Sequence, residues 1–252
     1  LAFWAYAPDS PGGTISITAD SKTMTDFSPA ASLADQVDFV TANATGTKSA
    51  NEAAGVPLVF NHRLTQIEVL AKTDNKVYTY KVSGVRIGEP VSKGSFDFET
   101  AAWTLDTDKA IYTDTYTDAK TLSSDPVSVM GDGGNAMILP QQLVAWDPET
   151  DAANAAQGAY LSIKLQVSTA ETGVQVYPFP SNGDCQWAAI PIDTNWEAGK
   201  KYIYTLDLTH GAGNVDPHDP DPGKPVLGGP IKFTVDVVDW VDTPENVPMT
   251  AK

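Results

Sequence analysis

Three aspartates near the C-terminal end of the chain have the side chains most suited to chemistry. Asp216, Asp219 and Asp221 lie in the loop NVDPHDPDPGKP, and carboxylate oxygens are the hard ligands that Ca²⁺ prefers. Their spacing does not match an EF-hand, and the prolines between them favour an extended, polyproline-like chain. The sequence leaves a calcium site in residues 214–225 open, but it favours a stiff, solvated connection between two strands.

The histidines and the single cysteine are the other candidates for catalysis. His62 falls on the apolar face of a strand-like run, which indicates a structural histidine, buried or at an edge, that bonds to the backbone. His210 and His218 lie in or beside the acidic loop without an evident partner. Cys185 has no base close to it in sequence, so a half-buried structural cysteine is favoured over a reactive thiol. No Ser, His and Asp set has the local pattern of a nucleophile, so we assign no catalytic residue, metal site or cofactor.

Glycines and tryptophans suggest two kinds of ligand site. The segment GDGGNA at 131–136 lacks the Lys-Ser/Thr pair and the helix of a phosphate-binding loop, so a glycine-rich turn is favoured. Aromatic faces stack on sugar rings, and the chain has six tryptophans. Five of them lie at strand ends or turn borders, where tryptophan also fills sandwich cores: Trp103, Trp146, Trp187, Trp196 and Trp240. Packing is favoured, and a carbohydrate platform stays open.

Composition excludes several functions. The 252 residues include 16 Lys and Arg and 32 Asp and Glu, a net charge of −16 that repels nucleic-acid backbones and anionic membranes. One cysteine permits no disulfide within the chain. The sequence shows no signal peptide, and its apolar opening LAFWAYAP is too short for a membrane span, so we expect a mature or trimmed chain.

Strand patterns occur along most of the chain and predict an all-β protein. Apolar and polar residues alternate in runs rich in β-branched and aromatic side chains, bounded by Gly, Pro, Asn or Asp. These runs cover residues 14–19, 37–40, 56–72, 76–87, 95–105, 135–146, 159–169, 174–179, 199–213 and 230–240. A weak capping box at residues 32–35 predicts one short helical turn, and residues 152–157 form another brief helix or a loop.

Two strand runs change their apolar face midway. In residues 56–72 the apolar positions switch parity after Leu64, which places a bulge or bend near Thr65 or Gln66. The same reversal recurs at Val238 and Trp240, so both runs are expected to kink or to pass between layers. A polar, Thr-rich stretch from Asp106 to Pro126 is the expected linker, which divides the chain into β-sandwich domains at 1–115 and 116–252.

Ordered blocks along the chain resemble a known family. The blocks VPLVFNHRLTQIEVLAK, VSGVRI, MILPQQLVAW, WEAGKKYIYTLDLTHGAG and VLGGPIKFTVDVVDW, with the acidic loop before the last, are similar to those of the fimbrillin-like proteins of Bacteroidetes. This resemblance implies two transthyretin-like β-sandwich domains in tandem. It also implies a non-enzymatic subunit of type V pili, exported as a lipoprotein precursor to the outer membrane and cell surface.

The resemblance further implies assembly by strand exchange, in which the terminal strand of one subunit enters a groove on the next. The candidate first strand has Leu1, Phe3 and Ala5 on one face. No arginine adjoins it, so a cleavage site after arginine is not carried over, and residues 241–252 are short and proline-interrupted for a donor strand. The expected partners are other pilin subunits and a host or bacterial surface receptor.

Two other functions compete with a fimbrial subunit or adhesin. A carbohydrate-binding surface lipoprotein would require exposed, coplanar tryptophans. A hydrolase on a β-sandwich would require paired carboxylates about 5 to 9.5 Å apart in a cleft.

Overall fold

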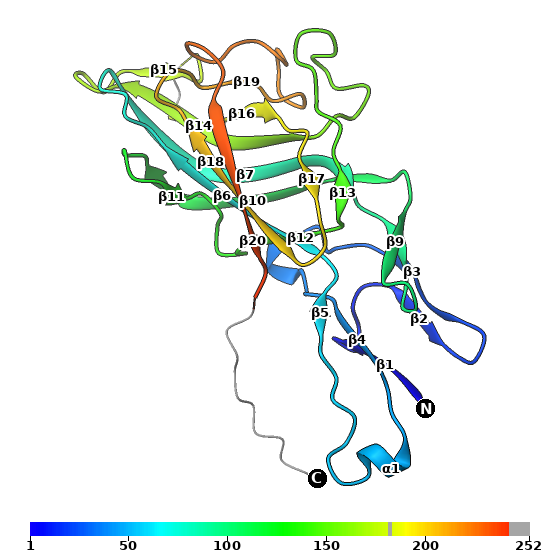
Figure 1. Ribbon diagram of the computed structural model, residues 1–252. Helices are drawn as coiled ribbons and strands as arrows, with labels where there is room; N and C mark the ends of the chain where they lie inside the picture. The colour runs from blue at the N-terminus through cyan, green and yellow to red at the C-terminus, as the bar shows by residue number, and fades with distance from the viewer. Residues whose placement is uncertain (181–182, 242–252) are drawn as a thin grey trace.

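The computed structural model describes residues 1–180 and 183–241, and almost all of its regular structure is β-strand (Figure 1). The all-β class is therefore confirmed. The largest sheet has the order β10-β7-β14-β16-β19, and β15 also pairs with β14. Its strands are β7 (Tyr78–Val91), β10 (Lys109–Thr121), β14 (Tyr160–Thr169), β15 (Gln175–Tyr177), β16 (Gln186–Pro191) and β19 (Asn214–Val215).

A second sheet has the order β11-β6-β18-β20, with β12 also paired to β6. Its strands are β6 (Thr65–Lys72), β11 (Val127–Ser128), β12 (Ala136–Ile138), β18 (Lys200–Asp207) and β20 (Lys232–Asp239). The two predicted C-terminal strand runs pair antiparallel as β18 and β20, and β18 also runs parallel to β6.

The larger core lies between these two sheets. Alternate residues of β6 and β18 point inward, as the period of two in their sequences requires, and they meet apolar residues of β7 and β14. The core includes Ile67, Val69, Tyr204, Leu206, Val82, Val85, Ile163 and Leu165, all 1% exposed or less. This pattern makes the larger unit a β-sandwich.

A smaller unit lies beside the sandwich and has its own core. One sheet has the order β1-β4-β5 and another has the order β2-β3-β8-β9. Their strands are β1 (Ala2–Ala7), β2 (Thr14–Ile17), β3 (Lys22–Phe27), β4 (Val40–Thr45), β5 (Asn61–His62), β8 (Gly94–Asp97) and β9 (Ala102–Leu105). The small core is rich in aromatic rings: Met24, Phe27, Phe39, Leu64, Phe96, Phe98 and Leu139.

The remaining elements are short. A two-stranded sheet joins β13 (Gln141–Gln142) to β17 (Asn195–Trp196), and η1 (Leu33–Asp35) is a 3₁₀ turn at the predicted capping box. Ser32 makes no side-chain cap there, so the turn forms without the bond that the box predicts. The helix α1 (Lys48–Asn51) falls between β4 and β5, where no helix is predicted, and residues 152–157 form turns.

The polar stretch expected to be a linker is instead a strand. Most of it forms β10, a 13-residue edge strand of the largest sheet, paired with β7. Its threonines suit a strand, and its outer side meets water, so it lacks the apolar alternation that the linker prediction relied on.

The larger core also draws on both sides of the predicted boundary at residues 115 and 116. Strands β6 and β7 precede it, yet they pair with β18 and β14, which follow it. The division into 1–115 and 116–252, and with it the number of tandem domains, stays a prediction.

The predicted change of face near Thr65 is confirmed as a passage between sheets. β5 pairs with β4 in the small unit, whereas β6 begins at Thr65 and pairs with β18 in the sandwich. Leu64 accordingly packs in the small core and Ile67 in the large one. The second predicted reversal is similar, because Val235 packs against the large core and Trp240 against the small one.

Candidate functional site

The predicted first strand lies at the edge of a sheet. Within the described residues β1 pairs only with β4, with Phe3 opposite Ala44 and Ala5 opposite Ala42. Leu1 and Gly46 exchange two backbone hydrogen bonds of 2.9 Å, so the odd-numbered residues of β1 turn their N–H and C=O groups toward β4. The even-numbered residues, Ala2, Trp4 and Tyr6, therefore direct theirs to the free edge.

The two faces of β1 have different surroundings. Trp4 and Tyr6 pack against the small core, which holds the strand in place. Leu1 and Phe3 lie on the opposite face and are 90% and 37% exposed, and Ala5 is half-buried. The predicted face Leu1, Phe3 and Ala5 is thus the side of the strand that does not pack on the small core.

A hollow of about 400 Å³ adjoins this face. Apolar side chains of Leu1, Phe3, Val56 and Leu58 line it. Lys48 and Glu52 also line it, with Nζ of Lys48 3.6 Å from Oε1 of Glu52. Gly46 makes the close turn possible, since a Cβ there would lie 2.4 Å from Cγ2 of Val56. We call β1, β4, α1, β5 and their connections, residues 1–7 and 40–62, the arm. Figure 1 shows it extending away from the large sandwich, with α1 at its far end.

The edge of β1 differs in charge from the long edges elsewhere in the described chain. β10 has Lys109, Asp114, Asp118 and Lys120 and a break in register, and β20 has Lys232, Asp236 and Asp239. Charges and bulges of this kind prevent a sheet edge from pairing with another chain. β1 has no charged residue. The shorter edge strands β2 and β9 are also uncharged, but they have only four residues each.

Residues 56–60 are the part of the arm that sequence patterns miss. The prediction makes one strand of residues 56–72, whereas pairing between β4 and β5 stops at Thr41 and Asn61. The segment VPLVF before Asn61 therefore lies outside the ladder, and Leu58, Val59 and Phe60 are exposed. Its lack of charge and its proline, Pro57, are the signals that could have set it apart from an ordinary strand.

The three loop aspartates have three different partners. Asp216 is fully buried, with Oδ1 2.8 Å from a guanidinium nitrogen of Arg86, and it also accepts a hydrogen bond from Ser162. Asp219 accepts a 3.2 Å bond from the backbone N–H of Trp187, and its burial raises the pKa of its carboxyl group. Asp221 pairs with Lys224 at 2.8 Å.

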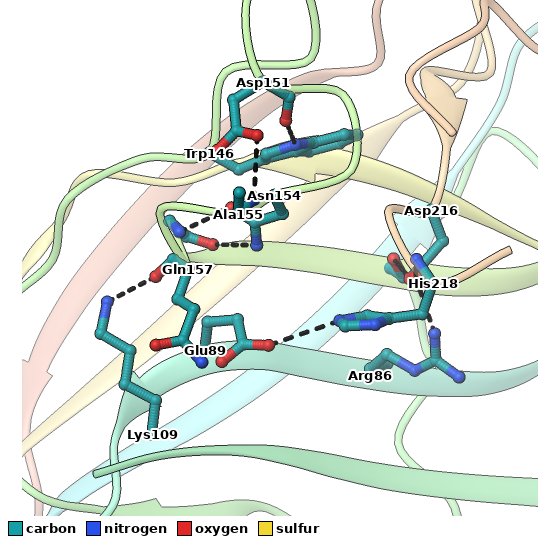
Figure 2. A network of polar contacts seen from close by, with 12 residues as sticks. Arg86, Glu89, Lys109, Trp146, Asp151, Asn154, Ala155, Gln157, Asp216 and His218 are labelled. Atoms are coloured by element: carbon teal, nitrogen blue, oxygen red, sulfur yellow. Dashed lines mark hydrogen bonds and ion pairs between the residues drawn. The ribbon is translucent and has the colours of Figure 1, made fainter. Parts of the chain in front are cut away.

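The acidic loop is therefore attached to the large sheet, and the prediction of a solvated connection is wrong for Asp216 and its neighbours. His218 also has a partner, because its Nε2 lies 3.3 Å from the buried carboxylate of Glu89 on β7 (Figure 2). Sequence patterns missed Arg86 and Glu89. The signal that could have pointed to Arg86 is that the chain has only two arginines.

His62 is half-buried and contacts the side chain of Asp38. Nδ1 of His62 lies 2.6 Å from Oδ2 of Asp38, where a backbone bond was predicted. Its ring also stacks on Trp240, with centroids 4.2 Å apart and planes 7° from parallel. This contact joins the arm to the end of β20.

The other candidates lie in a turn, at half-buried positions or in the cores. Residues 131–134 form a turn in which the N–H of Gly133 donates to Oδ2 of Asp114, so the glycine-rich turn is confirmed. Cys185 is half-buried, as predicted. None of the six tryptophans is in an exposed position: Trp146, Trp187 and Trp196 are buried, and Trp4, Trp103 and Trp240 are half-buried.

Comparison with known proteins identifies the group to which this chain is similar. A family model described as fimbrillin-like matches residues 1–240. No protein with a curated description matches the chain. Among the described residues, no helix combines the length and apolar character needed to cross a membrane.

Several solved structures are similar over nearly the whole chain. A proposed cell adhesion protein from Parabacteroides distasonis has 10% identity and a TM-score of 0.51, over 97% of this chain and 76% of that one. A similar protein from Bacteroides uniformis has 17% identity and a TM-score of 0.47, over 95% and 73%. A third from Bacteroides ovatus has 17% identity and a TM-score of 0.45, over 96% and 69%. At these identities, the first structure supports a shared fold.

Proposed function

The chain belongs to the fimbrillin-like family, and from this premise we propose that it is a subunit of a surface fibre that joins its neighbours by strand addition at β1. A structural and adhesive role at the cell surface follows from the family. Strand addition, export as a lipoprotein and anchoring at the outer membrane are parts of the proposal. So are a non-enzymatic role and binding to a surface receptor.

The observation that supports strand addition is the uncharged free edge of β1. Ala2, Trp4 and Tyr6 direct backbone N–H and C=O groups away from β4, and an incoming extended segment can bond to them. Trp4 and Tyr6 meanwhile anchor the strand on the small core, so the edge is held in a fixed position. Specificity would come from side chains that enter the hollow beside Leu1 and Phe3.

The carbohydrate-binding alternative has less support from the geometry. It requires coplanar exposed tryptophans, and all six are buried or half-buried. Binding of glycans through other side chains would appear as binding on a glycan array that survives substitution of Phe3.

The proposal is tested by placing a charge at the β1 edge. Phe3→Lys should reduce concentration-dependent association about tenfold or more, because an incoming strand would have to bury the ammonium group. Ile17→Lys on β2 is the matched control, since Ile17 is also 37% exposed and lies on an uncharged edge strand. Sedimentation velocity measures the association, and circular dichroism checks that both variants fold.

A second variant tests the backbone directly. Ala2→Pro removes one outward N–H while leaving the groups that bond to β4, so it should also weaken association. Association of Phe3→Lys and Ala2→Pro at the level of the unsubstituted chain would contradict strand addition at β1.

A further inference from the structure

Residues 56–60 have the composition of a strand without the pairing of one. Val56, Leu58, Val59 and Phe60 are apolar, and the last three are exposed, with Val59 at 74%. The ladder between β4 and β5 continues only to Asn61, so these residues form no pairs with β4 in the described structure. One backbone group of the segment has a partner, because the carbonyl oxygen of Val59 accepts a 3.2 Å bond from the side-chain amide of Asn61. Figure 1 shows the connection from α1 to β5 running lengthwise along the arm, and an elongated apolar segment outside any ladder can pair with another sheet edge.

The same arm holds a free edge of matching character. β1 and residues 56–60 both lack charged side chains, and both contribute to one hollow, through Leu1 and Phe3 on one side and Val56 and Leu58 on the other. Residues alternate along an extended chain, so Val59 points away from the face that Leu58 presents to the hollow. Val59 can thus contact a second molecule while Leu58 stays beside the hollow of its own arm.

The charge of the chain indicates where a second copy of it can contact the first. At a net charge of −16, two copies repel one another over most of their surfaces. Contact between copies is therefore least opposed where both surfaces are neutral and apolar, as they are at β1 and at residues 56–60. Since each arm has both a free edge and an unpaired segment, a copy can accept a segment at its β1 and offer its own residues 56–60 to the next copy, a head-to-tail contact that can continue along a fibre.

We propose that residues 56–60 of one copy pair with the free edge of β1 of a second copy. This inference rests on the proposed strand addition at β1 and names the segment that is added, an internal one. The pairing gives the exposed backbone of both segments hydrogen-bond partners and removes Val59 and Phe60 from water.

Crosslinking tests the contact in the full chain. In a Cys185→Ser background, Phe3→Cys is made in one preparation and Val59→Cys in another that has a tag of different mass. Mixing the two under mild oxidation should give a disulfide-linked dimer of mixed mass. The matched control replaces Val59→Cys by Val144→Cys, because Val144 is 72% exposed and lies far along the chain in another loop.

Crosslinked dimer at the level of the Val144→Cys control overturns the inference. The double variant Phe3→Cys, Val59→Cys checks the alternative that the two segments meet within one copy. A disulfide that forms only in its monomer, with none between copies, also overturns the inference.

A charge at Val59 separates this inference from the proposed function. Val59→Lys should weaken association about tenfold, as Phe3→Lys does, whereas Val144→Lys should leave it unchanged. Added salt should strengthen association of the unsubstituted chain, because it screens the repulsion between two anionic copies. If Phe3→Lys prevents association and Val59→Lys does not, β1 binds a different segment, and this inference fails while the proposed function stands. If neither variant changes association, both fail.

Discussion

Asp216 is a fully buried carboxylate in a loop of prolines and aspartates, and Arg86 is its counter-ion. Arg86 also lies over the ring of Trp187, 4.2 Å from its centre, and its side chain is 15% exposed. Two charges removed from water in this way are tolerated only because each compensates the other. The pair therefore fixes the loop on the sheet more firmly than its composition suggests.

Asp216→Ala should lower the free energy of unfolding by about 3 to 5 kcal/mol, because it leaves the Arg86 guanidinium buried without its partner. Lys224→Ala, which breaks the exposed pair with Asp221, should change it by about 0.5 kcal/mol or less. Urea unfolding of both variants, followed by tryptophan fluorescence, measures the difference. Similar values for the two would show that the buried pair does not hold the loop.

Strand β7 depends on a single glycine at the point where it crosses a buried ring. Gly88 lies opposite Tyr160 of β14, and a Cβ on Gly88 would be 2.1 Å from Cζ of that ring. Tyr160 itself has no room to move, since it is fully buried and packs beside Trp146. The close contact sets how near β7 and β14 can lie.

Gly88→Ala should therefore destabilise the protein by about 1 to 3 kcal/mol through overpacking. Gly229→Ala is the matched control, because the nearest atom to a Cβ there is the carbonyl oxygen of His210 at 3.7 Å. Thermal unfolding by calorimetry compares the two. A midpoint for Gly88→Ala equal to that of the control would mean that the sheet yields at this position.

Short-range sequence patterns predicted where the strands lie better than they predicted which strands pair. The change of parity after Leu64 correctly located the step from β5 to β6, since apolar residues must follow the core that they face. β10 was missed because an edge strand with a solvated side has no apolar alternation to detect.

Pairing over long distances had no local signal at all. β18 lies parallel to β6, with Lys201 opposite Gln66, and nothing near either residue specifies the other. The prediction also placed residues 56–60 in a strand, because their side chains are those of an ordinary strand. Only the absence of a pairing neighbour distinguishes them.

At the scale of the whole molecule, the two cores interleave along the chain. The small core takes residues from Met24 to Leu139 and the large one from Leu33 to Ile231. A division between residues 115 and 116 would cut β10 and separate β7 from β14. The predicted domain boundary and the strand pairing thus make opposite predictions for isolated halves.

We expect neither fragment 1–115 nor fragment 116–252 to unfold cooperatively alone, because the first lacks β14 and β18 and the second lacks β6 and β7, the strands that enclose the large core together. Differential scanning calorimetry of the separate fragments and of their mixture measures this. A sharp transition in either isolated fragment would favour the boundary at 115 and 116 over the reasoning from strand pairing.

The parallel pairing of β6 with β18 also has a consequence in time. Gln66 cannot pair with Lys201 until Lys201 has been synthesised, and at about 5 to 20 residues per second the chain from one to the other takes roughly 7 to 27 seconds. Throughout that interval β6 has no β18 beside it, and the sandwich cannot close. The newly made chain is therefore most vulnerable to aggregation and proteolysis just before β18 and β20 emerge. A factor that delays its folding would have this whole interval in which to bind the unpaired strands.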